Sequence, residues 1–155
     1  MLAIRQPRGY TLLELLVTVA IVAIVASLAV PSFQNMIATQ RVRSAANDLV
    51  ASLNFARSEA VKRNTTVLVT PAGASWAAGW DVEVGGADLR RHEPVESLTI
   101  TSKAGTDGQF GFLRDGRRSD NDLVTVAPPA SSGASALCVK LRATGRPSID
   151  SGVCP

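Results

Sequence analysis

The chain has 155 residues, of which 46% are hydrophobic, and a formal net charge of +3 at pH 7. This length supports one domain of modest size. The positive excess is too small for a protein that coats itself with nucleic acid, so any contact with a nucleic acid would be confined to a local site.

Residues 12–30 form an almost uninterrupted apolar run whose one charged member is Glu14. About 20 apolar residues span the hydrocarbon core of a bilayer as a helix, and a soluble core helix rarely stays apolar on every face for so long. Residues 1–9 are short and basic, with Arg5 and Arg8. The positive-inside tendency places this end in the cytoplasm and sends the rest of the chain outward.

The residues at the front edge of the run, Gly9-Tyr-Thr-Leu-Leu-Glu14-Leu-Leu, resemble the class III leader of type IV pilins and pseudopilins. The resemblance implies that residues 1–9 are a leader and that the prepilin peptidase cuts after Gly9. It also implies N-methylation of the new terminal residue, Tyr10, where the family usually has Phe. Residues 10–30 would then form a transmembrane segment that becomes part of a filament core. A plain membrane anchor or an uncleaved signal is the alternative interpretation.

Glu14 is a functional candidate on physical grounds alone. A carboxylate at membrane depth costs a few kcal/mol unless it has a partner. No Lys, Arg or His lies between Tyr10 and Gln40. The resemblance implies a partner from outside the chain, the amino terminus that cleavage exposes on a neighbouring subunit. Glu14 is therefore expected to act in assembly.

Residues 31–64 change to an amphipathic helical pattern. Pro31 removes a backbone hydrogen bond and is expected to kink the helix, and Asn64 is expected to end it just after Arg63. Apolar residues that recur every three or four positions predict one buried face: Val42, Ala46, Leu49, Leu53, Ala56 and Ala60.

Residues 65–155 show alternating apolar residues separated by Gly- and Pro-rich turns, which predicts an antiparallel β domain packed on the helix. The fold class is therefore α+β. The predicted apolar faces are Val67 with Val69, Trp80 with Val82 and Val84, Leu98 with Ile100, Phe110 with Phe112, and Val124 with Val126, before a last strand at residues 137–142.

Two further motifs resemble one branch of the pilin superfamily, the GspH/FimT branch of minor pilins and pseudopilins. They are the Ala-Arg-Ser-Glu-Ala helix end at residues 56–60 and the W-x-x-G-W signature made by Trp76, Gly79 and Trp80. This resemblance implies a type IV pilin-like fold, with a long N-terminal helix packed on an antiparallel β domain.

The two cysteines, Cys138 and Cys154, both lie on the side of the membrane that the topology makes oxidising. A disulfide is expected between them, rather than two free thiols. It would tie the C-terminal tail to the last predicted strand.

No enzyme, metal site or cofactor is expected. His92 is the only histidine and lies in a polar stretch that suggests a solvated surface position, so neither a Cys-His pair nor a transition-metal cluster can be assembled. Gly-rich phosphate motifs are absent. The acidic run at residues 115–122 does not have the spacing of an EF-hand.

The basic residues Lys140, Arg142 and Arg146 point outward if residues 137–142 form a strand, and no acid occurs between Asp122 and Ser148. A solvated face is one interpretation, and DNA contact is the other. Some FimT-type pilins bind DNA through a basic C-terminal Gly-Arg region. Here Ser148 replaces the second arginine of that GRxR-type motif.

Together these features predict a minor pilin that joins the priming or tip complex of a type IV pilus. Its partners would be other pilins in a hetero-oligomeric filament, the prepilin peptidase and the inner membrane. Its N-terminus would be cytoplasmic and its β domain periplasmic. The alternatives are a GspH-type minor pseudopilin of a type II protein secretion system and a DNA-binding receptor at the pilus tip in natural transformation.

Overall fold

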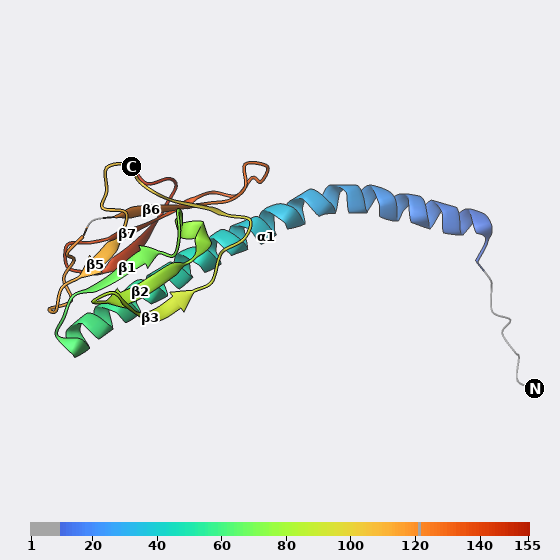
Figure 1. Ribbon diagram of the computed structural model, residues 1–155. Coiled ribbons are helices and arrows are strands. Elements are labelled where there is room, and N and C mark those ends of the chain that lie inside the picture. The colour runs from blue at the N-terminus through green and yellow to red at the C-terminus, as the bar shows by residue number, and fades with distance from the viewer. Residues whose placement is uncertain (1–9, 121) are drawn as a thin grey trace, which may run out of the picture. The chain divides into compact units, whose positions relative to one another are not determined.

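A computed structural model describes residues 10–120 and 122–155 and, within them, every side chain except those of residues 28–31. Contacts divide the chain into two compact units, Met1–Gln34 and Asn35–Pro155. One helix, α1 (Leu12–Arg63), belongs to both units, and all the strands belong to the second (Figure 1).

In the first unit, α1 presents its apolar side chains to the outside. The large hydrophobic residues from Leu12 to Val25 are more than half exposed, and an 18-residue window of the helix has a mean hydropathy of 2.6. Among the described residues, α1 is the one helix long and apolar enough, by length and composition, to cross a membrane. Such exposure suits a lipid or protein environment better than water.

α1 ends where the sequence predicts. Asn64 adopts a left-handed conformation with φ +53° and donates its N–H to the Val61 carbonyl at 3.3 Å. The N–H of Thr65 reaches back to the Ala60 carbonyl at 3.2 Å. This pair of bonds is the Schellman motif, which satisfies carbonyl groups that the end of a helix would otherwise leave without partners.

The predicted buried face of α1 in the second unit is confirmed. Its alanines, which have little bulk, let the sheets approach the helix closely. The buried helix residues are Ala38, Val42, Ala45, Ala46, Leu49, Leu53, Ala56 and Ala60.

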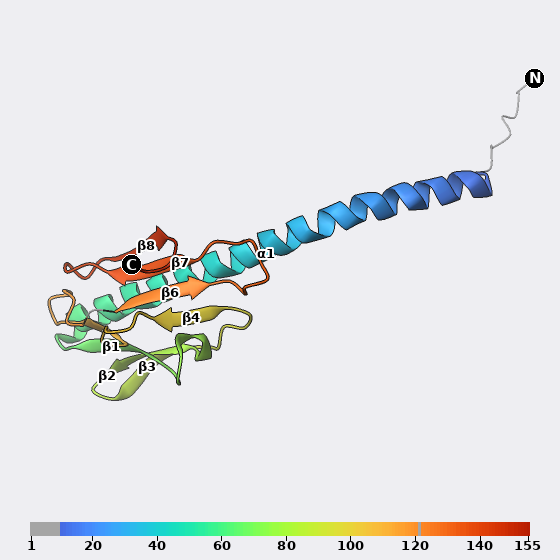
Figure 2. The ribbon, with the colours of Figure 1, turned by 90° about the horizontal axis from the view of Figure 1, so that it is seen from above.

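Two antiparallel four-stranded sheets lie along this part of α1 and share one hydrophobic core with it (Figure 2). One sheet has the order β3-β2-β1-β5 and the other the order β4-β6-β7-β8. The strands of the first are β1 (Val67–Pro71), β2 (Trp80–Val84), β3 (Ala87–His92) and β5 (Phe110–Phe112). Those of the second are β4 (Thr99–Ser102), β6 (Leu123–Ala127), β7 (Leu137–Leu141) and β8 (Pro147–Ser151). The predicted α+β class is confirmed.

β3 and β8 are the strands that the sequence analysis missed. Both are edge strands, and neither buries any residue fully. An edge strand with little burial shows no apolar alternation, and β8 also begins with a proline, which edge strands tolerate.

The W-x-x-G-W residues form the centre of the core. Trp76 lies in a short 3-10 helix, η1 (Trp76–Ala78), and its indole N–H donates to Ser102 Oγ at 2.7 Å, while that of Trp80 donates to Ser52 Oγ at 2.9 Å. Gly79 has φ +95°, and a Cβ there would lie 2.2 Å from the His92 carbonyl oxygen. The signature therefore encodes two buried indoles with hydrogen-bond partners and one close backbone approach.

His92 lies at the surface, as expected, but it is only partly solvated. Its ring stacks on Trp80 with centroids 3.9 Å apart, and its side chain is 32% exposed. Its Nε2 lies 3.9 Å from Asp48 Oδ2 on α1. His92 is the last residue of β3, so its packing depends on a strand that the sequence pattern did not reveal.

Candidate functional site

The processing position is at the edge of the described region. Gly9 lies outside the described residues. Tyr10 is 88% exposed, and it precedes the first residue of α1 by two positions. Cleavage after Gly9 and methylation of Tyr10 remain predictions.

Thr11 caps the start of α1. Its Oγ1 accepts the backbone N–H of Glu14 at 3.2 Å, and its carbonyl accepts the N–H of Leu15 at 3.1 Å. Thr11 and Glu14 have the T-x-x-E spacing of a capping box, and an acid in the first turn is favoured by the helix dipole. The Glu14 side chain is exposed, and within residues 10–120 and 122–155 no ion pair to it is formed.

α1 is one continuous helix through residue 31. The Pro31 side chain is among those not described, and the kink expected there remains a prediction.

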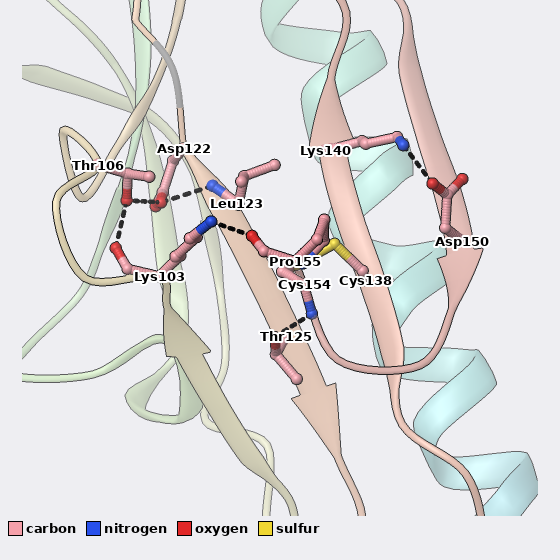
Figure 3. Close-up of a disulfide and its surroundings, with 10 residues drawn as sticks. All are labelled: Lys103, Thr106, Asp122, Leu123, Thr125, Cys138, Lys140, Asp150, Cys154 and Pro155. Atoms are coloured by element: carbon pink, nitrogen blue, oxygen red, sulfur yellow. Dashed lines mark hydrogen bonds and ion pairs between the residues drawn. A yellow bond between two sulfur atoms is a disulfide. The ribbon is translucent and has the colours of Figure 1, made fainter.

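The disulfide joins Cys138 on β7 to Cys154, 16 residues later, with their Cα atoms 5.0 Å apart (Figure 3). Cys154 also donates its backbone N–H to Thr125 Oγ1 on β6 at 3.1 Å. The Pro155 carbonyl oxygen accepts a hydrogen bond from Lys103 Nζ. The tail is therefore held against two strands of one sheet and the loop that follows a third.

Lys140 differs from the other two candidate DNA-binding residues. Its ammonium group pairs with Asp150 on β8, as Figure 3 shows. Asp150 lies opposite Cys138 in the β7–β8 register, one diagonal step from Lys140. Lys140 therefore already has an ion-pair partner within the chain.

Arg142 and Arg146 are exposed at the two ends of the turn that joins β7 to β8. Arg142 donates its backbone N–H to the Arg146 carbonyl at 3.0 Å, and Gly145 donates to the Arg142 carbonyl at 2.8 Å. In the described part of the chain, neither arginine takes part in an ion pair.

The acidic run at residues 115–122 contains one fully buried carboxylate, that of Asp122. It accepts hydrogen bonds from Ser102 Oγ at 2.8 Å, Thr106 Oγ1 at 2.5 Å and the Leu123 N–H at 2.7 Å. Since Ser102 also accepts from Trp76, this carboxylate links the β4–β5 loop to the core. Among the described residues, no group of three or more His, Cys, Asp or Glu side chains is placed to hold a metal ion.

Two family models match the chain. One, described as Type II transport protein GspH, matches residues 45–145, and the other, described as Prokaryotic N-terminal methylation motif, matches residues 4–30. The chain belongs to the GspH family of minor pilins and pseudopilins. The family consists of structural subunits, so membership implies assembly with other pilins, and the methylation motif implies processing by a prepilin peptidase.

The chain is similar to one curated protein and to two solved structures. The Type II secretion system protein H of Xanthomonas campestris pv. campestris is 34% identical over 76 residues, which make up 48% of this chain and 45% of that protein. The match thus spans less than half of that relative. Two crystal structures of the type IV minor pilin FimU of Pseudomonas aeruginosa PAO1 have TM-scores of 0.62 and 0.59 at 22% and 23% identity. They cover 72% and 70% of this chain and 89% and 91% of the FimU chains, which shows a shared fold.

The sequence analysis missed two features of this GspH-family chain that bear on function. The T-x-x-E spacing of Thr11 and Glu14 could have been recognised in the sequence as a helix cap. The ion pair between Lys140 and Asp150 could not be predicted from the sequence, because the prediction requires that β8 be recognised as the partner of β7.

Proposed function

We propose that this GspH-family protein is a minor pilin that joins the priming or tip complex of a type IV pilus. The first part of α1 holds it in the inner membrane before assembly. Its N-terminus is cytoplasmic and its second unit is periplasmic. The observation that carries the proposal is the Glu14 carboxylate, which lies in the first turn of an exposed apolar helix and has no ion-pair partner among the described residues.

Two features support this assignment. An unpartnered acid at membrane depth is costly, and a partner from another subunit would remove that cost on assembly. The methylation motif at residues 4–30 implies that a new amino terminus is made beside it. The same amine on a neighbouring subunit is the partner we assign to Glu14.

A substitution at Glu14 can test the charge of the side chain separately from its role in capping the start of α1. Glu14→Gln keeps a residue that suits the third position of a capping box, but it removes the charge. The variant should reach the membrane at the wild-type level, yet its share of sheared filaments should fall at least several-fold. Thr18→Val is the matched control, because it removes a polar group from the same span without changing the charge, and its incorporation should stay normal.

Quantitative immunoblots of membrane and sheared fractions make this measurement. Glu14→Gln incorporated at the wild-type proportion would remove the role in assembly. A variant absent from the membrane would point instead to a role of Glu14 in insertion.

The runner-up is a GspH-type pseudopilin of a type II secretion system, and it is favoured by the name of the Xanthomonas relative. The FimU likeness extends over more of this chain, but it shows the fold alone. A deletion strain tests the choice: loss of surface pili with normal protein secretion supports the pilus, and the opposite result supports the secretion machine.

A second candidate function is DNA capture at the pilus tip. It is favoured by the exposure of Arg142 and Arg146 without ion pairs among the described residues. An Arg142→Gln/Arg146→Gln variant should lose DNA uptake and keep its filaments. Normal uptake by that variant would remove this candidate and leave the assembly role in place.

A further inference from the structure

The chain makes the same Gly-Arg turn twice. The first turn is Leu113–Arg117 and the second turn is Arg142–Arg146. In each, the first residue donates its N–H to the carbonyl of the last, at 2.8 Å and 3.0 Å, and the glycine donates to the carbonyl of the first residue, at 2.8 Å in both. The glycines, Gly116 and Gly145, have φ +76° and +74°. Five residues separate the paired positions in both hairpins, from Phe112 to Arg118 and from Leu141 to Pro147.

The two turns lie against each other. A Cβ on Gly145 would be 1.9 Å from the Gly116 carbonyl oxygen, so only a glycine permits this approach. Arg118 crosses between the hairpins, because its N–H reaches the Ala143 carbonyl at 3.4 Å and its Nη1 donates to the Leu141 carbonyl at 3.0 Å. The first turn is also fixed to α1, since Arg57 Nε donates to the Gly116 carbonyl at 3.0 Å.

This contact places four exposed arginines on adjoining loops: Arg114, Arg117, Arg142 and Arg146. Within the described residues none of them forms an ion pair, whereas Arg63 and Arg91 each pair with a carboxylate. Asp115 is the one acid in the two turns, and its Oδ1 accepts the backbone N–H of Arg117 at 2.9 Å. The surface therefore carries a net positive charge on a rigid backbone.

We propose that the two turns form a single binding site for the phosphate backbone of DNA, to which Arg114 and Arg117 contribute as Arg142 and Arg146 do. The inference rests on the DNA-capture candidate and extends it to a turn far from the C-terminus. Guanidinium groups bind phosphate oxygens through two parallel N–H donors, and several of them on adjoining loops suit a polymer of phosphates. The site reads no base sequence, because it contacts the backbone only.

The position of the turns favours DNA over a lipid headgroup. Gly116 is next to Arg57 and Val61, near the end of α1, whereas the helix enters the second unit at Asn35. At 1.5 Å per residue, the site is about 35 Å along the helix from the start of that unit. Headgroup binding would be expected at the other end of the helix in this unit, where the sequence continues into the apolar segment.

The test measures binding of the full chain, in a nonionic detergent, to a short fluorescent DNA duplex over a range of salt concentrations. Four phosphate contacts give a log-log slope of about −3.6. Arg114→Gln/Arg117→Gln and Arg142→Gln/Arg146→Gln should each flatten the slope by about 1.8 and weaken binding at least tenfold at low salt. Arg41→Gln/Arg43→Gln is the matched control, since it removes two exposed arginines near the start of the second unit, and it should bind as the wild type does.

A glycine variant tests the contact between the turns without changing any charge. Gly145→Ala should weaken DNA binding, because the new methyl group collides with the first turn. Gly86→Ala is the control for the strain of placing an alanine in a left-handed backbone conformation. Gly86 has φ +82°, and a Cβ there would meet no atom within 4 Å, so the substitution introduces the strain without a collision. If Gly145→Ala and Gly86→Ala have the same melting temperature and bind the DNA duplex with the same affinity, the proposal of a joint site is contradicted.

Other outcomes separate this inference from the candidate on which it rests. If only the Arg142→Gln/Arg146→Gln variant loses affinity, the joint site is wrong and DNA capture by the second turn stands. If the wild-type protein shows no salt-dependent binding, both are wrong. If vesicles of phosphatidylglycerol bind through these arginines and the duplex does not, the ligand is a lipid surface and the DNA assignment fails.

Discussion

At the scale of single residues, Asp81 and Arg91 make the most complete ion pair of the second unit. They face each other across β2 and β3, and Arg91 Nε and Nη2 donate to the two carboxylate oxygens at 2.7 and 2.8 Å. The hydrogen bonds from Arg91 hold the pKa of Asp81 below its ordinary value of 3.8, although burial opposes them. A lowered folded-state pKa means that this carboxylate stabilises the fold only while it is ionised.

We expect Asp81→Asn to lower the melting temperature by a few degrees at pH 7. The stabilisation is fully present above pH 3.8 and is lost as the pH falls through the lower folded-state pKa. The difference between variant and wild type should therefore shrink in acid below pH 3.8. Thermal unfolding of the full chain at neutral and acidic pH measures this. Asp88→Asn, which removes the longer 3.5 Å contact of Arg91, should have a smaller effect. A difference that stays constant down to strongly acidic pH would contradict the assignment.

Residue roles that depend on local spacing were predictable, and roles that depend on register were not. The Cys138–Cys154 bond followed from the compartment and the count of cysteines, and the structure confirms it. The partners of Lys140 and His92 were not predicted, because Asp150 and Trp80 lie on neighbouring strands. Cross-strand partners become visible only when every strand and its register are known.

At the scale of elements, the C-terminal tail depends on its disulfide. The bond closes a short loop beside β7 and β8, and in the chain-entropy model a loop of this size stabilises the fold by about 3 kcal/mol. Hydrogen bonds from Cys154 to Thr125 and from Lys103 to Pro155 are weak restraints without it.

Cys154→Ala should lower the free energy of unfolding by about 3 kcal/mol and leave the tail open to carboxypeptidase. Denaturant titration and limited digestion of the full chain measure the two effects. Reduction of the wild-type protein should reproduce both. Equal stability of the oxidised and reduced forms would show that the sheet alone holds the tail.

The sequence pattern predicted the helix and the central strands, but it did not predict the edge strands β3 and β8. α1 ends at Arg63 as predicted, because helix periodicity and a left-handed Asn are local signals. The central strands were found through their buried alternating residues. β3 and β8 were missed because an edge strand need bury little.

At the scale of the whole molecule, processing decides whether the chain can enter a filament. Gly9→Val places a branched side chain where the peptidase approaches the backbone, so the variant should accumulate as a precursor that keeps residues 1–9. Intact-mass spectrometry of the membrane fraction measures this. Tyr10→Phe, which restores the usual family residue, is the control and should be cleaved fully. A Gly9→Val protein whose mature mass begins at Tyr10 would place the cleavage site elsewhere.

The continuous α1 helix also has a mechanical consequence. α1 runs without a break from Leu12 to Arg63, so tension along the helix is carried by its backbone. Within the second unit, the buried helix face runs along both sheets. A force along the helix axis therefore acts in shear on all the contacts between the buried helix face and the two sheets at the same time, so these contacts do not break one after another.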